Sequence, residues 1–212
     1  LSIDTSEVEN KVIEEALAKK LRASYYFMGS LLSKYHHVEM YFPGGCKIGK
    51  RPIDYHIKGF EALGATVKID GDKYIIDAPE LNGTDITFDF PSVGATINIM
   101  LAAVKANGQT RIFNAAKEPE IVNIADFLKS MGAKIKGAGT DTITITGVKK
   151  LSKGNIYTIP DRIEAGTYII AGALVGDHLV IDKIEPKHLK SLLDTLKNMN
   201  VDYILEENSI II

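Results

Sequence analysis

The stretch DFLKSMGAKIK, residues 126–136, contains the pattern that decides the fold. Its first half reads as the end of an amphipathic helix. Gly132 then stands after the last apolar helical residue, where glycine ends helices because it tolerates a left-handed backbone. Lys134–Lys136 and Ile143–Ile145 read as two strands joined by the glycine-rich turn between them. The stretch therefore predicts a helix that ends at a glycine and leads into a β-hairpin.

The same landmark occurs twice more, once before and once after this stretch. Gly64 and Asn200 take the place of Gly132, each between an amphipathic helix and two strands. Upstream of each landmark lies a helix that is apolar nearly all round, followed by a short strand. The unit is therefore helix, strand, helix, strand, strand, at a spacing of roughly 70 residues, which predicts an α/β (α+β) fold with three repeats. The strands after the apolar helices are Val38–Phe42, Arg111–Phe113 and Leu179–Ile181.

Further elements follow from the same periodicities. The hairpin strands of the outer copies are expected at Thr66–Ile69 and Tyr74–Ile76, and at Val201–Ile204 and Ser209–Ile212. The segment Val8–Leu21 places its apolar residues on one helical face, which predicts one more helix ahead of the first copy.

One loop is longer in the first copy than in the other two. It reads PGGCKIGKRP, residues 43–52, between a predicted strand and a predicted helix at Asp54–Leu63, and it holds the single cysteine, Cys46. Lys47, Lys50 and Arg51 stand beside this thiol, and cations lower the pKa of a cysteine. The alternative is a buried and unreactive cysteine. Because repetition explains the scaffold but not the added length, we favour a functional thiol.

Two other stretches allow two interpretations each. Phe90–Thr96, FPSVGAT, enters a helix whose free N–H groups suit a phosphate. Ser92 there is equally the kind of residue that caps helices. Ile159–Glu164, IPDRIE, reads either as a charged hinge between lobes or as a solvated loop. The adjacent His36 and His37 do not amount to a metal site, since zinc takes three or four ligands.

Composition narrows the class of protein. The 212 residues fit one large domain or two small ones. A formal net charge of -2 argues against a general nucleic-acid binder. One cysteine excludes an internal disulfide framework. No apolar run approaches the roughly 20 residues that cross a bilayer, and no signal peptide is recognisable. We therefore expect a cytoplasmic protein, or a piece of one, without nucleic-acid or membrane partners.

The motifs together resemble a known family. The motifs that carry this resemblance are, in order, PGGCxIGxRPID, PSVGAT, NAAKEPEIV, SMGAKIKGAGT and IPDRIEAGT. Between about Leu21 and Ile212 the chain is similar to the UDP-N-acetylglucosamine enolpyruvyl transferases (1-carboxyvinyltransferases). The resemblance implies an inside-out barrel fold of two lobes, each of three βαβαββ units, with the active site between the lobes. It implies transfer of the enolpyruvyl group from phosphoenolpyruvate to the sugar's 3-hydroxyl, with release of phosphate, in peptidoglycan synthesis. No metal or other cofactor is implied.

The resemblance also implies roles for residues. Cys46 resembles the loop cysteine that adds to phosphoenolpyruvate and that fosfomycin alkylates. Phe90 departs from the lysine that some relatives carry there. The remaining matches are Arg22 and Arg51 for phosphoenolpyruvate, and Arg51, Pro52, Ile53, Asp54, His56, Ser92, Val93 and Gly94 for the UDP-sugar.

A family member is about twice as long, and several of its catalytic residues have no counterpart in these 212 residues. The resemblance therefore implies that residues 1–159 hold two units of the cysteine-loop lobe and that 160–212 begin the second lobe. The chain alone is then expected to be inactive without the remainder of the enzyme. Three alternatives stay open: a single three-unit domain over 1–212, the sister enzyme acting on shikimate 3-phosphate, and a non-catalytic binding module.

Overall fold

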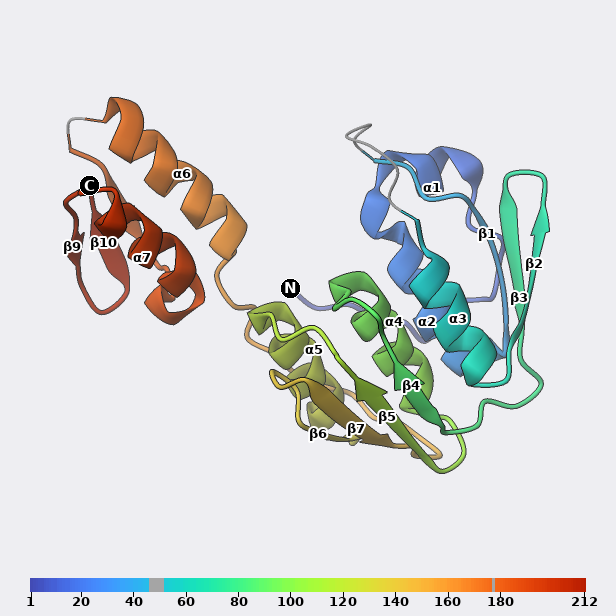
Figure 1. Ribbon diagram of the computed structural model, residues 1–212. Helices are drawn as coiled ribbons and strands as arrows, with labels where there is room; N and C mark the ends of the chain where they lie inside the picture. The colour runs from blue at the N-terminus through green and yellow to red at the C-terminus, as the bar shows by residue number, and fades with distance from the viewer. Residues whose placement is uncertain (46–51, 177) are drawn as a thin grey trace. The chain divides into compact units, whose positions relative to one another are not determined.

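The computed structural model describes residues 1–45, 52–176 and 178–212 (Figure 1). The chain divides into two compact units, Leu1–Ile156 and Tyr157–Ile212, each with its own hydrophobic core. The mixture of helices and strands agrees with the predicted α/β class.

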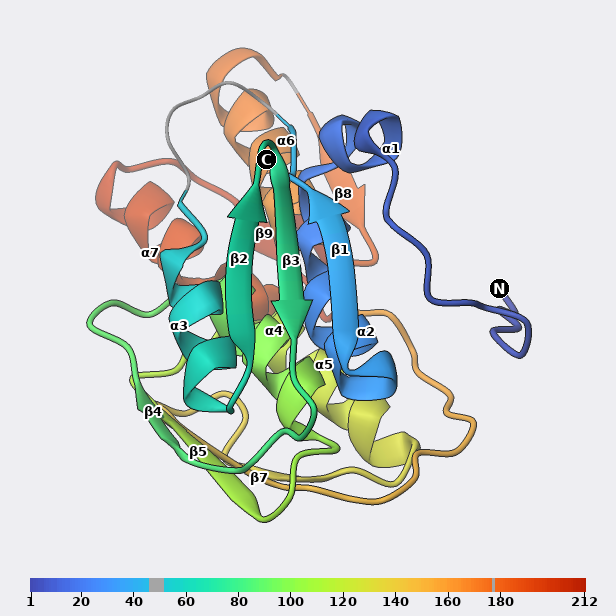
Figure 2. The same ribbon diagram turned by 90° about the vertical axis from the view of Figure 1, so that its right-hand side faces the viewer.

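The first half of the larger unit is a three-stranded antiparallel sheet with helices on one face (Figure 2). Val38 and Met40 on the first strand are both fully buried, because alternate side chains of a strand point to the same face. On the opposite face the side chains of β1 and β3 are half-buried and those of β2 are exposed. The elements are α2 (Tyr26–Tyr35), β1 (His37–Tyr41), α3 (Asp54–Ala62), β2 (Thr66–Asp70) and β3 (Lys73–Asp77), with strand order β1-β3-β2.

The second half of this unit is a four-stranded sheet whose first two strands run parallel. A parallel pair needs a crossover, which α4 supplies. The elements follow the order βαβαββ: β4 (Asp85–Thr87), α4 (Val93–Ala103), β5 (Gln109–Phe113), α5 (Pro119–Ser130), β6 (Lys134–Lys136) and β7 (Thr142–Thr146). The short strand β4 is not among the elements predicted from the sequence.

Helix α4 lies between α2 and α3, and glycines on those two helices allow the close approach. A Cβ atom at Gly29 on α2 would lie 2.3 Å from the carbonyl oxygen of Asn98 on α4. A Cβ atom at Gly59 on α3 would lie 2.2 Å from Cδ1 of Ile99. A larger residue at Gly29 would push the two helix backbones apart, whereas one at Gly59 would require the Ile99 side chain to move. This packing fixes where the first turns of the three helices lie relative to one another.

The three predicted helix stops are confirmed. Gly64, Gly132 and Asn200 have φ angles of 99°, 102° and 58°, the left-handed conformation expected after the last turn of a helix. Gly64 and Gly132 are followed by strands where these were predicted, Thr66–Asp70 and Lys134–Lys136.

The smaller unit contains a long helix and a small sheet of order β8-β10-β9. Asp161 caps the helix, since its Oδ1 accepts hydrogen bonds from the N–H groups of Ile163 and Glu164 over 2.8 and 3.1 Å. The charged residues near 161–164 therefore begin a helix. The elements are α6 (Arg162–Val175), β8 (Val180–Asp182), η2 (Pro186–Leu189), α7 (Lys190–Asn198), β9 (Ile204–Leu205) and β10 (Ser209–Ile211).

Two predicted elements are mostly wrong. The segment Val8–Leu21 is helical only at α1 (Glu15–Lys20), because the N–H of Ile13 bonds to the carbonyl oxygen of Glu39 over 3.1 Å and the chain there runs extended beside β1. The strand predicted at Val201–Ile204 begins only at its last residue, because the N–H of Val201 still bonds to Leu196 at the end of α7.

Candidate functional site

The candidate site is built around the first turn of α4. Ser92 caps the helix, with its Oγ accepting from the N–H of Ala95 over 3.3 Å. Within the described part of the chain, the N–H groups of Val93 and Gly94 have no hydrogen-bond partner. Unpaired N–H groups at a helix start, together with the helix dipole, favour an anion. Ser92 therefore acts as a cap, and its hydroxyl hydrogen remains able to donate to a ligand.

Side chains from two other elements lie against Gly94. A Cβ atom there would lie 2.9 Å from Oη of Tyr25 and 3.1 Å from Nε2 of His56. The rings of Tyr25 and His56 meet edge to face, with centroids 4.9 Å apart. The guanidinium of Arg22 lies over the Tyr25 ring, 5.6 Å from its centroid. Thus four residues from three separate segments of the sequence gather at one helix start, and three of them were predicted site residues.

A fully buried asparagine holds this group together. Nδ2 of Asn98 donates to the carbonyl oxygen of Tyr25 over 3.0 Å and pairs with Nδ1 of His56 over 2.8 Å. Its Oδ1 accepts from the N–H of Gly29 over 3.0 Å. One side chain on α4 therefore connects η1 (Arg22–Tyr25), α2 and α3.

The electrostatics around His56 favour its neutral form. Burial, with a further contribution from the positive charge of Arg22, lowers the pKa of His56 to about 4, while the carboxylate of Asp54 acts in the opposite direction. Burial also raises the pKa of Tyr26, whose hydroxyl accepts a hydrogen bond from Tyr25 over 3.3 Å. Both rings are therefore uncharged hydrogen-bonding groups near pH 7.

The described start of the 43–52 loop lies next to this site. The N–H of Gly44 donates to the carbonyl oxygen of Ala18 over 3.0 Å. Gly45 has a φ of 110°, and a Cβ atom there would lie 2.9 Å from Cβ of Arg22. The loop thus leaves the described structure beside Arg22. Cys46 and Arg51, for which a thiolate and a phosphate contact are predicted, lie outside the described residues, as do the cations Lys47 and Lys50.

The far end of the loop leads directly into α3. Pro52 and Asp54 are exposed, whereas the side chain of Ile53 is only 6% exposed and belongs to the core. Ile53 can therefore meet a ligand only through its backbone. Phe90, ahead of α4, is 68% exposed and available for contact with a ligand or another part of the protein.

A shallow hollow of about 400 Å³ adjoins the start of α4, lined by Pro91, Ala115, Lys117 and Glu118. Oε2 of Glu118 is buried there, and no described group bonds to it. The N–H of Ala116 donates to Oγ1 of Thr96 over 3.1 Å, which ties this loop to α4. The hollow therefore belongs to the same end of the unit.

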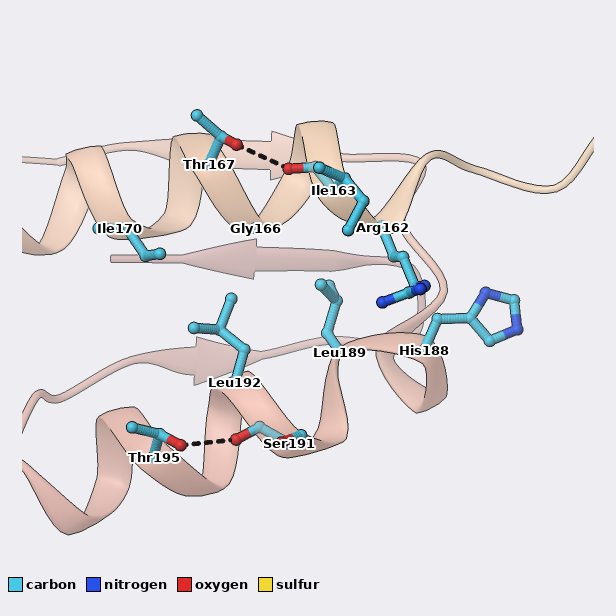
Figure 3. A pocket seen from close by; sticks show the side chains of 10 residues that line it. All are labelled: Arg162, Ile163, Gly166, Thr167, Ile170, His188, Leu189, Ser191, Leu192 and Thr195. Atoms are coloured by element: carbon cyan, nitrogen blue, oxygen red, sulfur yellow. Dashed lines mark hydrogen bonds between the residues drawn. The ribbon is translucent and has the colours of Figure 1, made fainter. Parts of the chain in front are cut away.

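The smaller unit has a hollow of its own, of about 430 Å³, between α6 and the segment that includes η2 and α7 (Figure 3). Arg162 and His188 lie at one end, and leucine and isoleucine side chains line the middle. Nδ1 of His188 is buried and has no partner among the described residues. None of the residues predicted for the site lines this hollow.

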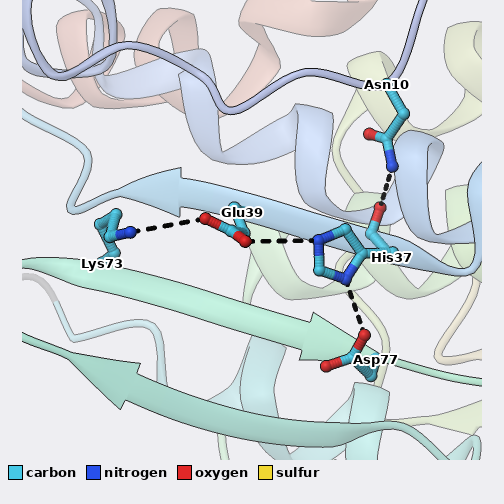
Figure 4. A network of polar contacts seen from close by, with 5 residues as sticks. All are labelled: Asn10, His37, Glu39, Lys73 and Asp77. Carbon is cyan, nitrogen blue, oxygen red and sulfur yellow. Dashed lines mark hydrogen bonds and ion pairs between the residues drawn. The ribbon is translucent and has the colours of Figure 1, made fainter.

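A polar cluster lies on the three-stranded sheet (Figure 4). Nδ1 of His37 pairs with Asp77 over 2.7 Å, and Glu39 contacts both His37 and Lys73 over 3.6 and 3.4 Å. Among the described residues, no three His, Cys, Asp or Glu side chains are placed to hold a metal ion. The cluster is a surface feature of the sheet.

No helix in the described part of the chain is long and apolar enough to span a membrane.

Sequence reasoning missed two residues of the site. Asn98 is the polar residue within the apolar run of α4, and a buried amide in such a run signals a required hydrogen-bond network. Tyr25 had no comparable signal, because its role depends on the packing of η1 against α3 and α4.

The chain matches one known protein family over nearly its whole length. A sequence model of the family described as EPSP synthase (3-phosphoshikimate 1-carboxyvinyltransferase) matches residues 2–212. UDP-N-acetylglucosamine 1-carboxyvinyltransferase 1 of Staphylococcus haemolyticus is 53% identical over 203 residues, which are 95% of this chain and 48% of that protein. UDP-N-acetylglucosamine 1-carboxyvinyltransferase of Clostridium botulinum is 51% identical over 210 residues, 99% of this chain and 50% of that protein. The chain thus spans about half the length of these curated relatives.

Solved structures show a similar fold at low identity. The enolpyruvyl transferase NikO from Streptomyces tendae superposes with a TM-score of 0.83 over 96% of this chain and 49% of that chain, at 22% identity. EPSP synthase from Acinetobacter baumannii gives a TM-score of 0.63 over 90% of this chain and 45% of that chain, also at 22% identity. These similarities concern the fold.

Proposed function

Because the chain belongs to the EPSP synthase (3-phosphoshikimate 1-carboxyvinyltransferase) family, we propose that it provides about half of an enzyme that moves an enolpyruvyl group from phosphoenolpyruvate to a hydroxyl. The proposed acceptor is the 3-hydroxyl of UDP-N-acetylglucosamine, and phosphate is released. Relatives at 51–53% identity carry the name of that activity, which supports the choice. The reaction belongs to cell-wall peptidoglycan synthesis, and a cytoplasmic location is part of the same proposal.

The main structural support is the open start of α4. Val93 and Gly94 offer two N–H groups that have no partner among the described residues, and Ser92 offers a hydroxyl. A diphosphate has the charge and the acceptor oxygens that such a helix start binds. We assign the diphosphate of the nucleotide sugar to this turn, and its uracil to the segment Pro52–His56 at the start of α3, with Arg51 alongside. The ring of His56 lies against Gly94 and so borders the diphosphate turn as well.

Phosphoenolpyruvate is assigned to the neighbouring cations. Arg22 lies beside Gly45, where the loop that carries Cys46 and Arg51 begins. A guanidinium binds phosphate and carboxylate oxygens through paired N–H groups. In this proposal the Cys46 thiolate reacts with phosphoenolpyruvate and is the group that fosfomycin alkylates. The cations next to Cys46 in the sequence support this role, because neighbouring positive charges stabilise a thiolate.

The proposal includes an organisation into lobes. Residues 1–159 would form two units of one lobe, and 160–212 would begin the other. The remaining groups of the cleft would come from the rest of the enzyme. Two observations support this division: the chain spans about half the length of its relatives, and helices and strands recur along it in a similar order.

The choice of acceptor tests the proposal. The 212-residue chain is titrated with UDP-N-acetylglucosamine and, separately, with shikimate 3-phosphate, while the amide signals of Val93 and Gly94 are followed by NMR. We expect saturable shifts with the nucleotide sugar and none with shikimate 3-phosphate. Binding of shikimate 3-phosphate alone would favour the sister enzyme. Binding of neither compound at millimolar concentration would favour a non-catalytic module.

A further inference from the structure

The buried ring of His56 has one nitrogen engaged and one nitrogen available. His56 is 5% exposed, and its Nδ1 pairs with Nδ2 of Asn98 over 2.8 Å. No described group pairs with Nε2. The Cε1–Nε2 edge faces the position where Gly94 lacks a side chain, at 3.0 and 3.1 Å from an added Cβ. A polar atom of a nearly buried ring is thus directed at the first turn of α4.

The partners of Asn98 determine its orientation. Its Oδ1 receives a hydrogen bond from the N–H of Gly29, and its Nδ2 donates to the carbonyl oxygen of Tyr25. A flipped amide would set two acceptors against each other at Tyr25 and two donors at Gly29. The group that faces His56 is therefore an N–H donor.

This orientation fixes the tautomer of His56. Because Asn98 donates to Nδ1 of His56, that nitrogen must accept through its lone pair and carry no hydrogen. The single proton of the neutral ring must therefore be on Nε2. Protonation of Nδ1 would break the bond to Asn98 and set two N–H groups against each other. The lowered pKa of His56 agrees with a ring that stays neutral. The available nitrogen is consequently a hydrogen-bond donor without a positive charge.

We propose that Asn98 is a positioning residue that holds His56 in its Nε2–H tautomer, and that this N–H donates to an anionic oxygen of a ligand at the start of α4. The ligand class, a nucleotide diphosphate, rests on the proposed function. The donor complements the N–H groups of Val93 and Gly94 and the hydroxyl of Ser92. The absence of a side chain at Gly94 keeps the path from Nε2 to the ligand open.

The tautomer is measured on the protein without ligand. Histidine side-chain ¹⁵N shifts at pH 7 distinguish a protonated Nε2 from a protonated Nδ1. We expect His56 to show the Nε2–H pattern. In Asn98→Asp, which presents a carboxylate oxygen to Nδ1, we expect a proton on Nδ1. An Nδ1–H or imidazolium pattern in the wild-type protein would overturn the inference without touching the proposed function.

The ligand contact is measured by titration with UDP-N-acetylglucosamine, UDP and inorganic pyrophosphate. We expect Nε2 of His56 and the amide of Gly94 to shift along one binding curve with each nucleotide probe. His56→Phe keeps the ring volume and should weaken binding roughly ten- to a hundredfold, because it removes a hydrogen bond to a charged group. His56→Gln retains a donor near the same place and should recover part of the loss. Glu61→Gln, at the exposed end of α3, is the control and should bind as the wild type does.

The outcomes separate the two proposals. Shifts at Gly94 without shifts at His56, or unchanged binding by His56→Phe, would overturn the role of His56 and leave the nucleotide site standing. No shifts at either residue would contradict both the nucleotide site and the ligand contact. Loss of binding that His56→Gln does not recover at all would indicate a packing role and would also overturn the inference.

Discussion

Asn98 donates a hydrogen bond to Nδ1 of His56 over 2.8 Å, from the middle of α4 to the first turns of α3. Both side chains are buried, at 0% and 5% exposure. A buried hydrogen bond of this kind holds two helices in one register and fixes the protonation of the ring. The ring of His56 therefore has a fixed position beside the start of α4, and the stability of the folded chain should depend on the protonation of this ring.

The first prediction concerns acid stability. The pKa of His56 is about 4 in the folded chain, below its ordinary value of 6.5, so the unfolded chain binds the proton more readily. Its contribution to stability is complete above pH 6.5 and is lost as the pH falls toward 4. Between pH 7 and pH 4.5 the loss from this group is about 2 to 3 kcal/mol. Urea unfolding at the two pH values should show a smaller loss in His56→Phe than in the wild type.

The control for acid stability is His178→Gln, because His178 is exposed. Its loss between the two pH values should equal that of the wild type, in which carboxylates also contribute. Equal losses in the wild type and in His56→Phe would contradict the assignment of His56 as a buried neutral base.

A second prediction concerns the contact of α2 with α4. In Gly29→Ala the new methyl would lie 2.3 Å from the carbonyl oxygen of Asn98 and 2.8 Å from its Oδ1. The helices must separate, which lowers the free energy of unfolding by about 1–3 kcal/mol. Chemical denaturation measures this loss. Ser30→Ala on the same helix should change stability by less than about 0.5 kcal/mol. A Gly29→Ala variant as stable as Ser30→Ala would show that the helices do not approach this closely.

The third prediction concerns turnover. With phosphoenolpyruvate and UDP-N-acetylglucosamine, the 212-residue chain by itself should release phosphate at least about 10²- to 10⁴-fold more slowly than a full-length relative, since the resemblance places the general base outside these residues. A coupled phosphate assay at matched protein concentration measures this ratio. Release at a comparable rate would mean that these residues suffice for the reaction.

The fourth prediction concerns Cys46. The cations that follow it in the sequence should hold its thiol pKa below the ordinary value of about 8.5. Iodoacetamide labelling across pH, followed by mass spectrometry, measures this pKa. Arg51→Ala should raise the pKa and slow labelling at neutral pH, whereas Lys68→Ala on the exposed strand β2 should not. Labelling that requires denaturation would indicate a buried, unreactive thiol.

Much of the fold was accessible from the sequence because its signals are local. Gly64, Gly132 and Asn200 end helices through their own backbone preference, so their positions were predicted correctly. The failures involve competition from distant residues. Ile13 pairs with Glu39 in place of the helical bond that its periodicity favours. The short strand β4 forms because β5 lies beside it. The interpretation as three repeats remains a prediction.

The site was predicted in part for the same reason. Ser92, Val93, Gly94 and His56 belong to short motifs, and the structure brings Gly94, His56 and Arg22 to one place. Asn98 and Tyr25 connect these motifs through packing between helices, which no single stretch of sequence displays. The assigned roles of all these residues remain predictions.

The central claim is that the start of α4 binds the diphosphate of UDP-N-acetylglucosamine, and calorimetric titration of the wild type and Gly94→Ala tests it most directly. The added methyl would lie 2.9 Å from Oη of Tyr25 and about 3 Å from the His56 ring, so it would press on both side chains at the proposed site. Gly71→Ala, in the turn between β2 and β3, is the control: its φ of 56° strains an alanine there, but its methyl meets nothing within 4 Å. We predict weak, saturable binding by the wild type and Gly71→Ala, and roughly tenfold weaker binding by Gly94→Ala, because the methyl displaces the Tyr25 and His56 side chains that border the helix start. Absence of saturable binding by the wild type, or equal binding by Gly94→Ala, would contradict the claim.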